Sequence, residues 1–270
     1  MKPRVTIVIP TINRDSLVES LNSVAGQTFQ GFEVIIVDDS KEQSVSVPGF
    51  RVVKTGGLAG VSKARNLGMS YASNEFIALL DDDDLWHSDY LATQIMNFER
   101  FGIDFGLTGA IVNGHRRPKI PLKVGVDPFD LLYGKPHLMR SKAYLPTSAY
   151  FFRTKIAEKV NFDASITDRE NLKFVWECFN KNYKFYQDPQ PLVTINYSSK
   201  ASLSRINITE EIEWSNYLGS LNQNWAASFL IESSRNFLRN GDRQSAKILV
   251  GLLNTKDNLA FKAILRIATI

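Results

Sequence analysis

Four consecutive aspartates, Asp81 to Asp84, directly follow the apolar run FIALL. Two carboxylates about 5 Å apart repel each other by roughly 3 kcal/mol at an effective dielectric of about 20, so the cluster favours a bound cation. On an extended backbone, Asp81 and Asp83 point to the same side and can face one ligand, while Asp82 faces elsewhere. Such hard oxygen ligands suit Mg²⁺ or Mn²⁺ that bridges to phosphates. The alternative is an acidic turn that caps a helix beginning near Ser88.

Three further polar segments follow apolar runs or a flexible loop. Asp38 and Asp39 end the run VIIV, and their carboxylates could bind a base or ribose hydroxyls or form an ordinary turn. The first apolar run ends in PTINR, which spans Pro10–Arg14. Lys63 and Arg65 follow a glycine-rich loop that could carry them towards the aspartates, the alternative being solvated charges on a helix. Ligands of open α/β sheets bind at the carboxyl ends of the strands, where these groups would meet.

The elements that must position these groups are read from the apolar pattern. Short apolar runs alternate with amphipathic stretches over the first hundred residues, which predicts a parallel βαβ sheet with helices on its faces. FEVIIV and FIALL are apolar without alternation, as in central strands covered on both faces. Helices are expected after the capping candidate Asp15 and over Ser62–Ala72. The predicted strands of this part are Val5–Ile9, Phe32–Val37, Phe50–Val53 and Phe76–Leu80.

The rest of the chain is less regular and more basic. The segment His115–Lys142 has seven Lys or Arg against two Asp, and its Pro and Gly residues predict loops and short helices. Strands over Tyr150–Phe152 and Leu192–Asn196 should flank a helix over Arg169–Lys181, and the chain should be helical from Thr209. Two amphipathic helices should close it, with apolar residues at Ile248, Leu249, Leu252 and Leu253, and at Leu259, Ala263, Ile264 and Ile267.

These elements predict an α/β fold with a mostly parallel central sheet, flanking helices and a C-terminal helical extension. We expect one α/β domain over residues 1–205 and the helical extension over 206–270.

Composition and length exclude several classes of protein. The chain has 270 residues, of which 44% are hydrophobic and 22% charged, so disorder as the main state is excluded. Its one cysteine, Cys178, cannot form an intramolecular disulfide, and its three histidines lack zinc-ligand spacing. No apolar run approaches the roughly 18 residues that span a bilayer, and the first residues lack the apolar core of a signal peptide. We therefore expect a cytoplasmic protein, soluble or peripheral on the inner face of the membrane.

The segments VTIVIPTINR, EVIIVDDS and GLAGVSKARNLGMSYASNEFIALLDDDDLW together resemble the nucleotide-sugar-binding half of the family 2 glycosyltransferases. The resemblance implies the GT-A fold, with the nucleotide-sugar-binding half in residues 1–113 and the acceptor-binding half in 114–205. It implies that Asp81 and Asp83 form the Asp-x-Asp motif that holds ribose and a metal ion, Mn²⁺ or Mg²⁺. The residues expected on the donor side are Pro10, Thr11, Asn13, Arg14, Asp38, Asp39, Lys63, Arg65, Asp81 and Asp82.

The catalytic base is where the chain departs from this family. The stretch NFDASITDRENLKFVWECF is similar to a family segment in which a Glu-Asp pair opens a helix and supplies the base. Here the pair reads Glu170 and Asn171, and an amide cannot accept the proton. Glu170 and Asp168 are the available carboxylates, and we favour Glu170. The structural alternative is that Asp168 caps the helix and the other two residues occupy its first turn.

The resemblance implies an inverting hexosyltransferase that moves a sugar from a nucleoside diphosphate, with a UDP-sugar favoured, to an acceptor hydroxyl. The basic segment His115–Lys142 suits a saccharide or lipid-linked saccharide acceptor, as in the assembly of a surface polysaccharide or glycolipid. Trp86 follows the aspartates directly and is expected on the acceptor side. Residues 235–270 carry seven basic and two acidic side chains, so they could rest on an anionic membrane surface or pack as ordinary helices.

Two other functions remain open at this point. Asn171 in the position of the base would suit a non-catalytic nucleotide-sugar-binding protein. A sugar nucleotidyltransferase would want a glycine-rich phosphate loop after the first strand, where this chain reads PTINR. The net charge of +4 does not indicate a nucleic-acid partner, because no motif that combines aromatic and basic residues for recognition appears.

Overall fold

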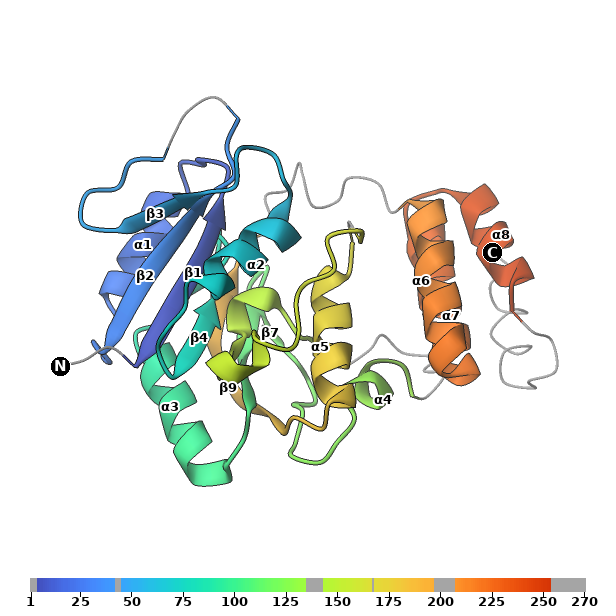
Figure 1. The fold of residues 1–270 in the computed structure, drawn as a ribbon. Coiled ribbons are helices and arrows are strands. Elements are labelled where there is room, and N and C mark those ends of the chain that lie inside the picture. The colour runs from blue at the N-terminus through green and yellow to red at the C-terminus, as the bar shows by residue number, and fades with distance from the viewer. Residues whose placement is uncertain (1–3, 42–44, 135–142, 167, 197–206, 254–270) are drawn as a thin grey trace. The chain divides into compact units, whose positions relative to one another are not determined.

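The computed structural model describes residues 4–41, 45–134, 143–166, 168–196 and 207–253. The chain divides into two compact units (Figure 1). Unit 1 comprises Met1–Val126 and Ala143–Tyr197, and unit 2 comprises Asp127–Lys142 and Ser198–Ile270. Residues 127–134, expected within the α/β domain, therefore group with the described helices of unit 2.

Unit 1 is built on one nine-stranded mixed sheet. Its parallel part places four strands side by side in the order β3 (Arg51–Lys54), β2 (Phe32–Asp38), β1 (Val5–Thr11) and β4 (Phe76–Leu79). Every residue of β1 and β4 is buried, which explains why these strands read as continuous apolar runs. Because these strands are parallel, the polar residues that follow β1, β2 and β4 reach the same edge of the sheet.

The sheet continues beyond β4 with shorter and mixed pairings. Strand β8 (Phe151–Arg153) pairs antiparallel with β4 and with β6 (Phe105–Val112). Strand β9 (Phe185–Ile195) runs parallel to β6 and pairs with the short β5 (Leu85–Trp86), while β7 (His115–Arg117) pairs with β6. The pairing of β5 with β9 brings the chain that follows the aspartates next to the end of β9.

Helix α2 (Val61–Ser70) lies unusually close to the sheet because of one glycine. A Cβ atom on Gly68 would lie 2.3 Å from Val8 Cγ1 in β1 and 2.9 Å from Val37 Cγ2 in β2. Arg65 lies three residues before Gly68 and so shares its side of the helix. The close approach of α2 therefore fixes the position of Arg65 at the carboxyl edge of the sheet.

Helices α1 (Leu17–Ala25), α3 (Tyr90–Phe101) and α5 (Glu170–Asn180), with the 3₁₀ turns η1 (Thr147–Ala149) and η2 (Thr154–Ile156), complete unit 1. Helix α5 buries Phe174 against Phe162, with stacked rings 4.2 Å apart, and near Phe152. Phe105 of β6 stacks on Phe152 and Phe185 within the same core. This aromatic cluster holds the start of α5, and with it Glu170, against the sheet.

Unit 2 is helical. It contains α4 (Pro128–Tyr133), α6 (Ile208–Leu221), α7 (Gln223–Arg239) and α8 (Arg243–Gly251). Side chains that accept backbone N–H bonds cap all four helices, for example Asn222 at the start of α7. The indole of Trp225 donates to Asp130 Oδ1 at 2.7 Å, which explains why α4 groups with the C-terminal helices. The shared apolar core consists of Leu230, Ile231, Phe237, Ala246, Leu249 and Leu253.

The predicted α/β fold, the parallel strands of the first half and the helices over 62–72, 169–181 and from 209 are confirmed to within a few residues. Strand β9 begins at Phe185 rather than Leu192, and its Pro189 and Pro191 hide the earlier part from an apolar pattern. Strand β6 was not among the predicted strands, because two glycines interrupt the apolar pattern of its run FGLTGAIV. The expected closing helix with Leu259 and Ile267 lies outside the described residues. None of the helices in the described ranges is long and apolar enough to cross a membrane.

Candidate functional site

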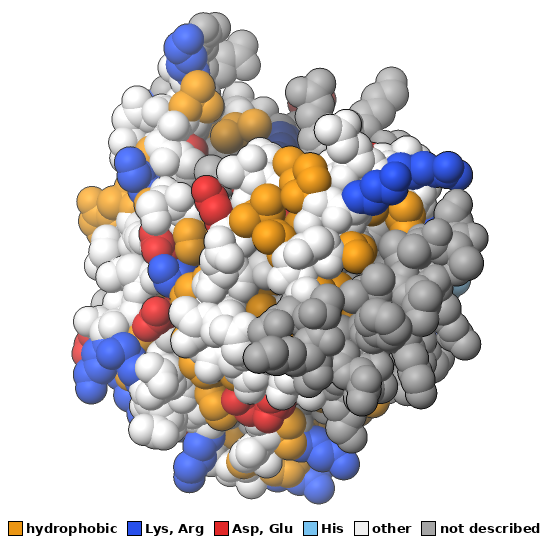
Figure 2. Space-filling model, turned by 90° about the vertical axis from the view of Figure 1, so that its right-hand side faces the viewer, with side chains coloured by type: hydrophobic (Ala, Val, Ile, Leu, Met, Phe, Trp, Pro, Cys, Tyr) orange, Lys and Arg blue, Asp and Glu red, His pale blue; other side chains and the backbone are white. Residues whose placement is uncertain are grey.

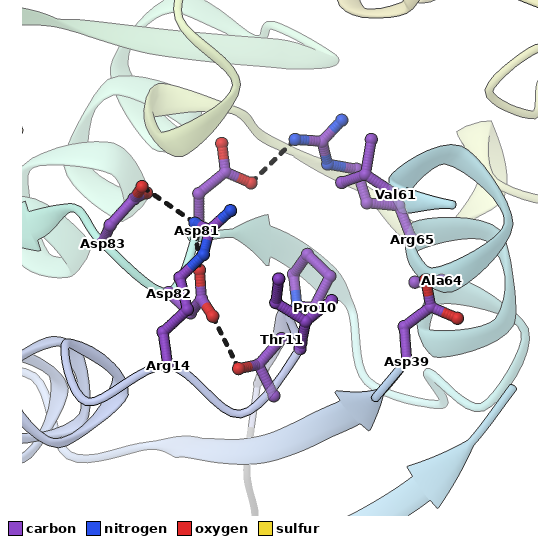
Figure 3. A pocket seen from close by; sticks show the side chains of 11 residues that line it. Pro10, Thr11, Arg14, Asp39, Val61, Ala64, Arg65, Asp81, Asp82 and Asp83 are labelled. Carbon is purple, nitrogen blue, oxygen red and sulfur yellow. Dashed lines mark hydrogen bonds and ion pairs between the residues drawn. The ribbon is translucent and has the colours of Figure 1, made fainter. Parts of the chain in front are cut away.

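A pocket of about 310 Å³ opens at the carboxyl edge of the parallel strands (Figure 3). The loop after β1, the end of β2, helix α2 and the aspartates after β4 all contribute to it. Its walls therefore join the four segments that the sequence analysis singled out. The lining residues are Pro10, Thr11, Ile12, Arg14, Asp39, Val61, Ala64, Arg65, Asp81, Asp82 and Asp83.

Asp82 and Asp83 are held by residues of the loop after β1. Asp82 is buried, and it accepts hydrogen bonds from Thr11 Oγ1 at 2.5 Å and from Arg14 Nη1 at 2.9 Å. The same Arg14 nitrogen donates to Asp83 Oδ2 at 2.9 Å. Burial raises the pKa of Asp82 and of Asp83, and neighbouring carboxylates raise both further, while Arg14 opposes the shift. The pocket thus concentrates negative charge that is expensive without a cation.

Asp84 faces away from the pocket and ties the segment to the rest of the sheet. It is buried, and its carboxylate accepts from Ser148 Oγ at 2.5 Å and from the backbone N–H of Asn196 at 3.0 Å. Burial raises the pKa of Asp84 to about 7, and the charge of Asp81 adds to the shift. Ser148 Oγ also accepts from the backbone N–H of Asp81 at 3.1 Å. Asp84 and Ser148 therefore hold the backbone that carries the pocket's carboxylates, and no sequence pattern indicates this role of Ser148.

Asp39 lines the pocket, but its carboxylate already organises the loop before α2. It accepts from the backbone N–H groups of Ala59 at 2.7 Å and Gly60 at 2.9 Å, and from the hydroxyl of Thr55. Asp38 is buried and accepts from the hydroxyl and the backbone N–H of Ser40 and from the backbone N–H of Val45, and it is not among the residues that line the pocket. Burial raises the pKa of Asp38, but these bonds outweigh burial and leave the pKa below its usual value.

Arg65 connects the aspartates to the start of α5. Its buried guanidinium donates from Nη2 to Asp81 Oδ1 at 2.7 Å and from Nη1 to Glu170 Oε1 at 2.8 Å. Burial lowers the pKa of Arg65, but the two carboxylates more than compensate and raise it, so the side chain stays charged. Asn66 fixes the neighbouring chain by exchanging two 2.8 Å hydrogen bonds with the backbone of Phe162, whose ring lies 5.2 Å from the guanidinium.

The two candidate bases occupy different surroundings. Glu170 is largely buried, with its side chain 13% exposed, and is joined to the pocket through Arg65. Asp168 is exposed and pairs with the adjacent Arg169 at 2.5 Å. Arg169 occupies the N-cap position of α5 without a side-chain cap bond, so the alternative of Asp168 as the helix cap is wrong. The amide of Asn171 donates to Leu145 O at 3.3 Å.

Three other predicted residues lie outside the lining of the pocket. Asn13 has a positive φ of 68°, and its backbone N–H donates to Thr11 Oγ1 at 3.0 Å, so it shapes the loop that carries Arg14. Lys63 lies on the exposed side of α2. Trp86, expected on the acceptor side, is instead only 4% exposed. Its indole donates to Ser148 O at 2.7 Å and stacks on Tyr90, because β5 turns this side chain into the core.

The described residues contain no group of three His, Cys, Asp or Glu side chains arranged to hold a metal ion by themselves. Asp81 and Asp83 are the partly exposed carboxylates of the pocket, with side chains 29% and 35% exposed. Mg²⁺ and related ions at phosphate sites use one or two carboxylates and take further oxygens from phosphates and water. The two side chains therefore fit an ion that is shared with a bound diphosphate.

Residues 6–123 match the sequence model of the family described as Glycosyl transferase family 2. The amylovoran biosynthesis glycosyltransferase AmsB of Erwinia amylovora is 25% identical over 230 residues, which cover 78% of this chain and 74% of AmsB. An Escherichia coli protein, UDP-Glc:alpha-D-GlcNAc-diphosphoundecaprenol beta-1,3-glucosyltransferase WfgD, is 30% identical over 109 residues, or 37% of this chain and 43% of WfgD.

Solved structures show the same fold at low sequence identity. TarS residues 1–349 of S. aureus in complex with UDP-GlcNAc superimposes with a TM-score of 0.65 at 18% identity, covering 99% of this chain and 80% of that one. The mannosyltransferase PcManGT of Pyrobaculum calidifontis, in complex with GDP-Man and Mn²⁺, has a TM-score of 0.55 at 15% identity and covers 100% of this chain and 80% of that one. Residues 6–123 are therefore similar to the family 2 glycosyltransferases, and the chain has the GT-A fold.

Proposed function

We propose that the protein is an inverting hexosyltransferase that moves a sugar from a nucleoside-diphosphate donor, preferably a UDP-sugar, to a hydroxyl of a saccharide or lipid-linked saccharide. The observation that carries the proposal is the single pocket in which Arg14, Arg65 and the aspartates 81–83 meet. The names of two relatives support it, because WfgD uses a UDP-glucose donor and AmsB acts in amylovoran biosynthesis. The process would be the assembly of a surface polysaccharide or glycolipid.

The donor's nucleoside would lie against the loop after β1 and the end of β2. Pro10, Thr11 and Asp39 line the pocket on this side. Asn13 and Asp38 would act indirectly, because both hold backbone next to the pocket. Asp81 and Asp82 would face the ribose, and the basic groups Arg14 and Arg65 would face the phosphates, whereas Lys63, on the exposed side of α2, would not contact the donor in this pocket.

Asp83 and Asp81 are the side chains that would hold Mn²⁺ or Mg²⁺. A bound ion of this kind neutralises negative charge that grows on the departing diphosphate. The chain supplies positive charge of its own, since Arg14 and Arg65 both reach the aspartates within hydrogen-bond distance. These arginines orient the carboxylates and stabilise a diphosphate electrostatically.

Glu170 would accept the proton of the attacking hydroxyl. Inversion requires the hydroxyl to approach from the side opposite the leaving diphosphate, so the base must differ from the carboxylates that face the phosphates. Glu170 meets this condition, because it comes from α5 and is joined to Asp81 through Arg65. Its Oε1 accepts from Arg65, which orients the carboxylate. Asp168 is the second candidate, and it is more exposed than Glu170 and pairs with the adjacent Arg169.

We further propose that residues 1–205 form the catalytic domain, with donor and acceptor halves in 1–113 and 114–205, and that residues 206–270 are a helical extension. The extension would approach an anionic membrane surface on the cytoplasmic side. Arg235 and Arg239 lie 3.9 Å and 3.8 Å from Glu232 of the same helix. This negative charge weakens the attraction of the two arginines to an anionic membrane. Among the described residues, the Lys and Arg side chains on the face drawn in Figure 2 lie apart from one another. Liposome flotation with and without residues 235–270 tests this part.

Nucleotide release tests the donor site. Purified protein is incubated with UDP-, GDP- and dTDP-sugars in Mn²⁺, Mg²⁺ or EDTA, next to the Asp83→Ala variant and the exposed-carboxylate control Glu158→Gln. Slow metal-dependent release from one donor, absent in Asp83→Ala and retained in the control, is the expected result. Binding of a donor without release, even when candidate acceptors are supplied, would instead identify a nucleotide-sugar-binding protein. A product that joins a nucleotide to a sugar phosphate would identify a nucleotidyltransferase.

A further inference from the structure

Arg14 takes a position between two carboxylates that a metal ion would also take. Its Nη1 nitrogen lies 2.9 Å from Asp82 Oδ1 and 2.9 Å from Asp83 Oδ2. One positively charged nitrogen thus bridges two neighbouring carboxylates, as the close view of the pocket in Figure 3 shows. The bridge reduces the repulsion that burial and proximity impose on this pair.

The loop that carries Arg14 is built around Asp82. Thr11 Oγ1 accepts from the backbone N–H of Asn13 and donates its own hydrogen to Asp82 Oδ2. Asn13 adopts a positive φ, and asparagine tolerates this conformation better than most residues. The next residue is Arg14, so the turn aims its side chain at the same aspartate. The contact is therefore specified by the local fold and does not depend on a long side chain finding a partner by chance.

The two arginines of the pocket differ in their freedom to move. The side chain of Arg65 is 4% exposed and is fixed between Asp81 and Glu170. The side chain of Arg14 is 48% exposed, and Asp83 is the more exposed of its two partners. Breaking an exposed ion pair costs little free energy, whereas breaking a buried ion pair costs far more. Arg14 is thus the cation of this pocket that a ligand can displace.

We infer that Arg14 acts as an internal counter-ion that competes with the divalent metal for Asp83 until the donor arrives. In the free protein Arg14 neutralises Asp83 and keeps the affinity for the ion low. When ion and donor bind together, the ion replaces Arg14 at Asp83 and the released guanidinium meets the negative diphosphate. The ion and the nucleotide then raise each other's affinity by the same factor, as linkage requires. This inference rests on the proposed function, because it takes the ligand to be a nucleoside diphosphate.

Binding of Mn²⁺ is the direct test, measured from the signal of free Mn²⁺ in electron paramagnetic resonance, with and without saturating UDP. The full chain is compared with Arg14→Gln, which removes the charge, and Arg14→Lys, which keeps it. Arg4→Gln is the matched control, because Arg4 is also partly exposed and pairs with two carboxylates, Glu75 and Glu99. Arg4 directly precedes β1, at the end of the strand opposite to Arg14.

Arg14→Gln is expected to bind Mn²⁺ alone up to about fivefold more tightly than the wild type, since the ion no longer competes with a paired charge. The tightening by UDP should shrink in this variant and be kept in part by Arg14→Lys, which retains the charge, while Arg4→Gln should behave like the wild type. Thermal unfolding of each variant checks that it is folded. The wild-type protein gives a measurement that needs no variant, because Mn²⁺ should bind more tightly with UDP than without it.

Two results would overturn the inference and leave the proposed function standing. One is wild-type protein that binds Mn²⁺ equally well with and without UDP. The other is UDP-dependent Mn²⁺ binding that Arg14→Gln leaves unchanged or weakens in the absence of UDP. Failure of the proposed function would differ from both, because then neither UDP nor any donor sugar would bind, and the inference would fall with it.

Discussion

Glu170 at the start of α5 and Asp81 at the end of β4 share the guanidinium of Arg65, which donates to them at 2.8 Å and 2.7 Å. The two carboxylates belong to opposite ends of the proposed reaction, since Asp81 would face the donor and Glu170 the acceptor. A single buried cation thus fixes their separation. A displacement of α2 or of α5 would change both contacts at once.

Replacing Arg65 by lysine should damage both stability and activity. Lysine keeps the charge but offers one nitrogen where arginine offers two in a fixed plane. We expect the free energy of unfolding to fall by about 2 kcal/mol, because one buried carboxylate loses its partner. Turnover should fall by at least about tenfold, because Glu170 is no longer oriented. Urea unfolding and kcat check the two effects, and a variant with wild-type kcat would refute the orienting role of Arg65.

The two candidate bases are separated by amide substitutions. Glu170→Gln should lower kcat by about 100-fold or more, as expected for the loss of a general base, and leave the affinity for the donor within about twofold. Glutamine can still accept a hydrogen bond from Arg65, so the pocket should stay in place. Asp168→Asn should have little effect, because the exposed Asp168 pairs with the adjacent Arg169 and does not line the pocket. The reverse pattern would assign the base to Asp168.

Restoring an aspartate at position 171 should not restore a base. The amide of Asn171 donates to the carbonyl of Leu145 at 3.3 Å, and a carboxylate there would face this oxygen without a hydrogen. We expect Asn171→Asp to lower the free energy of unfolding by about 1 kcal/mol and to leave kcat unchanged or reduced. A clear increase in kcat would show instead that position 171 can reach the acceptor.

Gly68→Ala should destabilise the protein, although alanine normally favours helices. The new Cβ would lie 2.3 Å from Val8 Cγ1, so α2 must move away from the sheet and carry Arg65 with it. We expect a loss of about 1–3 kcal/mol, typical of overpacking, together with weaker donor binding. Gly251→Ala in α8 is the control, because nothing lies within 4 Å of its added Cβ. That change should be neutral or stabilising by up to about 1 kcal/mol.

Acid stability should depend on Asp163, which holds the segment before α5. Hydrogen bonds from Lys173 and Ser165 lower the pKa of Asp163 to about 2. A lowered pKa in the folded state means that the stabilisation is present above the usual carboxyl pKa and is lost as the pH falls through about 2. Asp163→Asn should flatten the dependence of unfolding free energy on pH between about 4 and 2, with little loss above it since the pair is partly exposed. If Asp163→Asn leaves this pH dependence unchanged, Asp163 does not contribute to acid stability as proposed.

The sequence was most informative about the apolar strands that end in polar residues. Burial on both faces gives β1, β2 and β4 their continuous apolar runs, so their ends, and with them Asp39 and Asp81, could be placed at one edge of the sheet. Strand β6 was not predicted because Gly106 and Gly109 interrupt its apolar pattern. These glycines make room for neighbouring backbone and side chains, and a local sequence pattern does not show such contacts.

Long-range contacts could not be read from the sequence. Arg65 and Glu170 are 105 positions apart, and no local rule predicts that a helix start so distant supplies the partner of a given arginine. Trp86 was misplaced for a related reason. The sequence shows that Trp86 lies close to the aspartates along the chain, but the direction of its side chain depends on the pairing of β5 with β9.

Ser148 gives the segment after β4 an unusual rigidity. Its hydroxyl contacts both Asp81 and Asp84, and its carbonyl accepts the indole of Trp86. One wall of the pocket is thus fastened at three points, while the opposite wall offers the apolar side chains of Val61 and Ala64. Changes in the size of those two side chains would widen or narrow the pocket without breaking a hydrogen bond. In the proposed donor site, substitutions of Val61 or Ala64 should therefore change the selectivity between donor sugars of different size, while the positions of the aspartates stay the same.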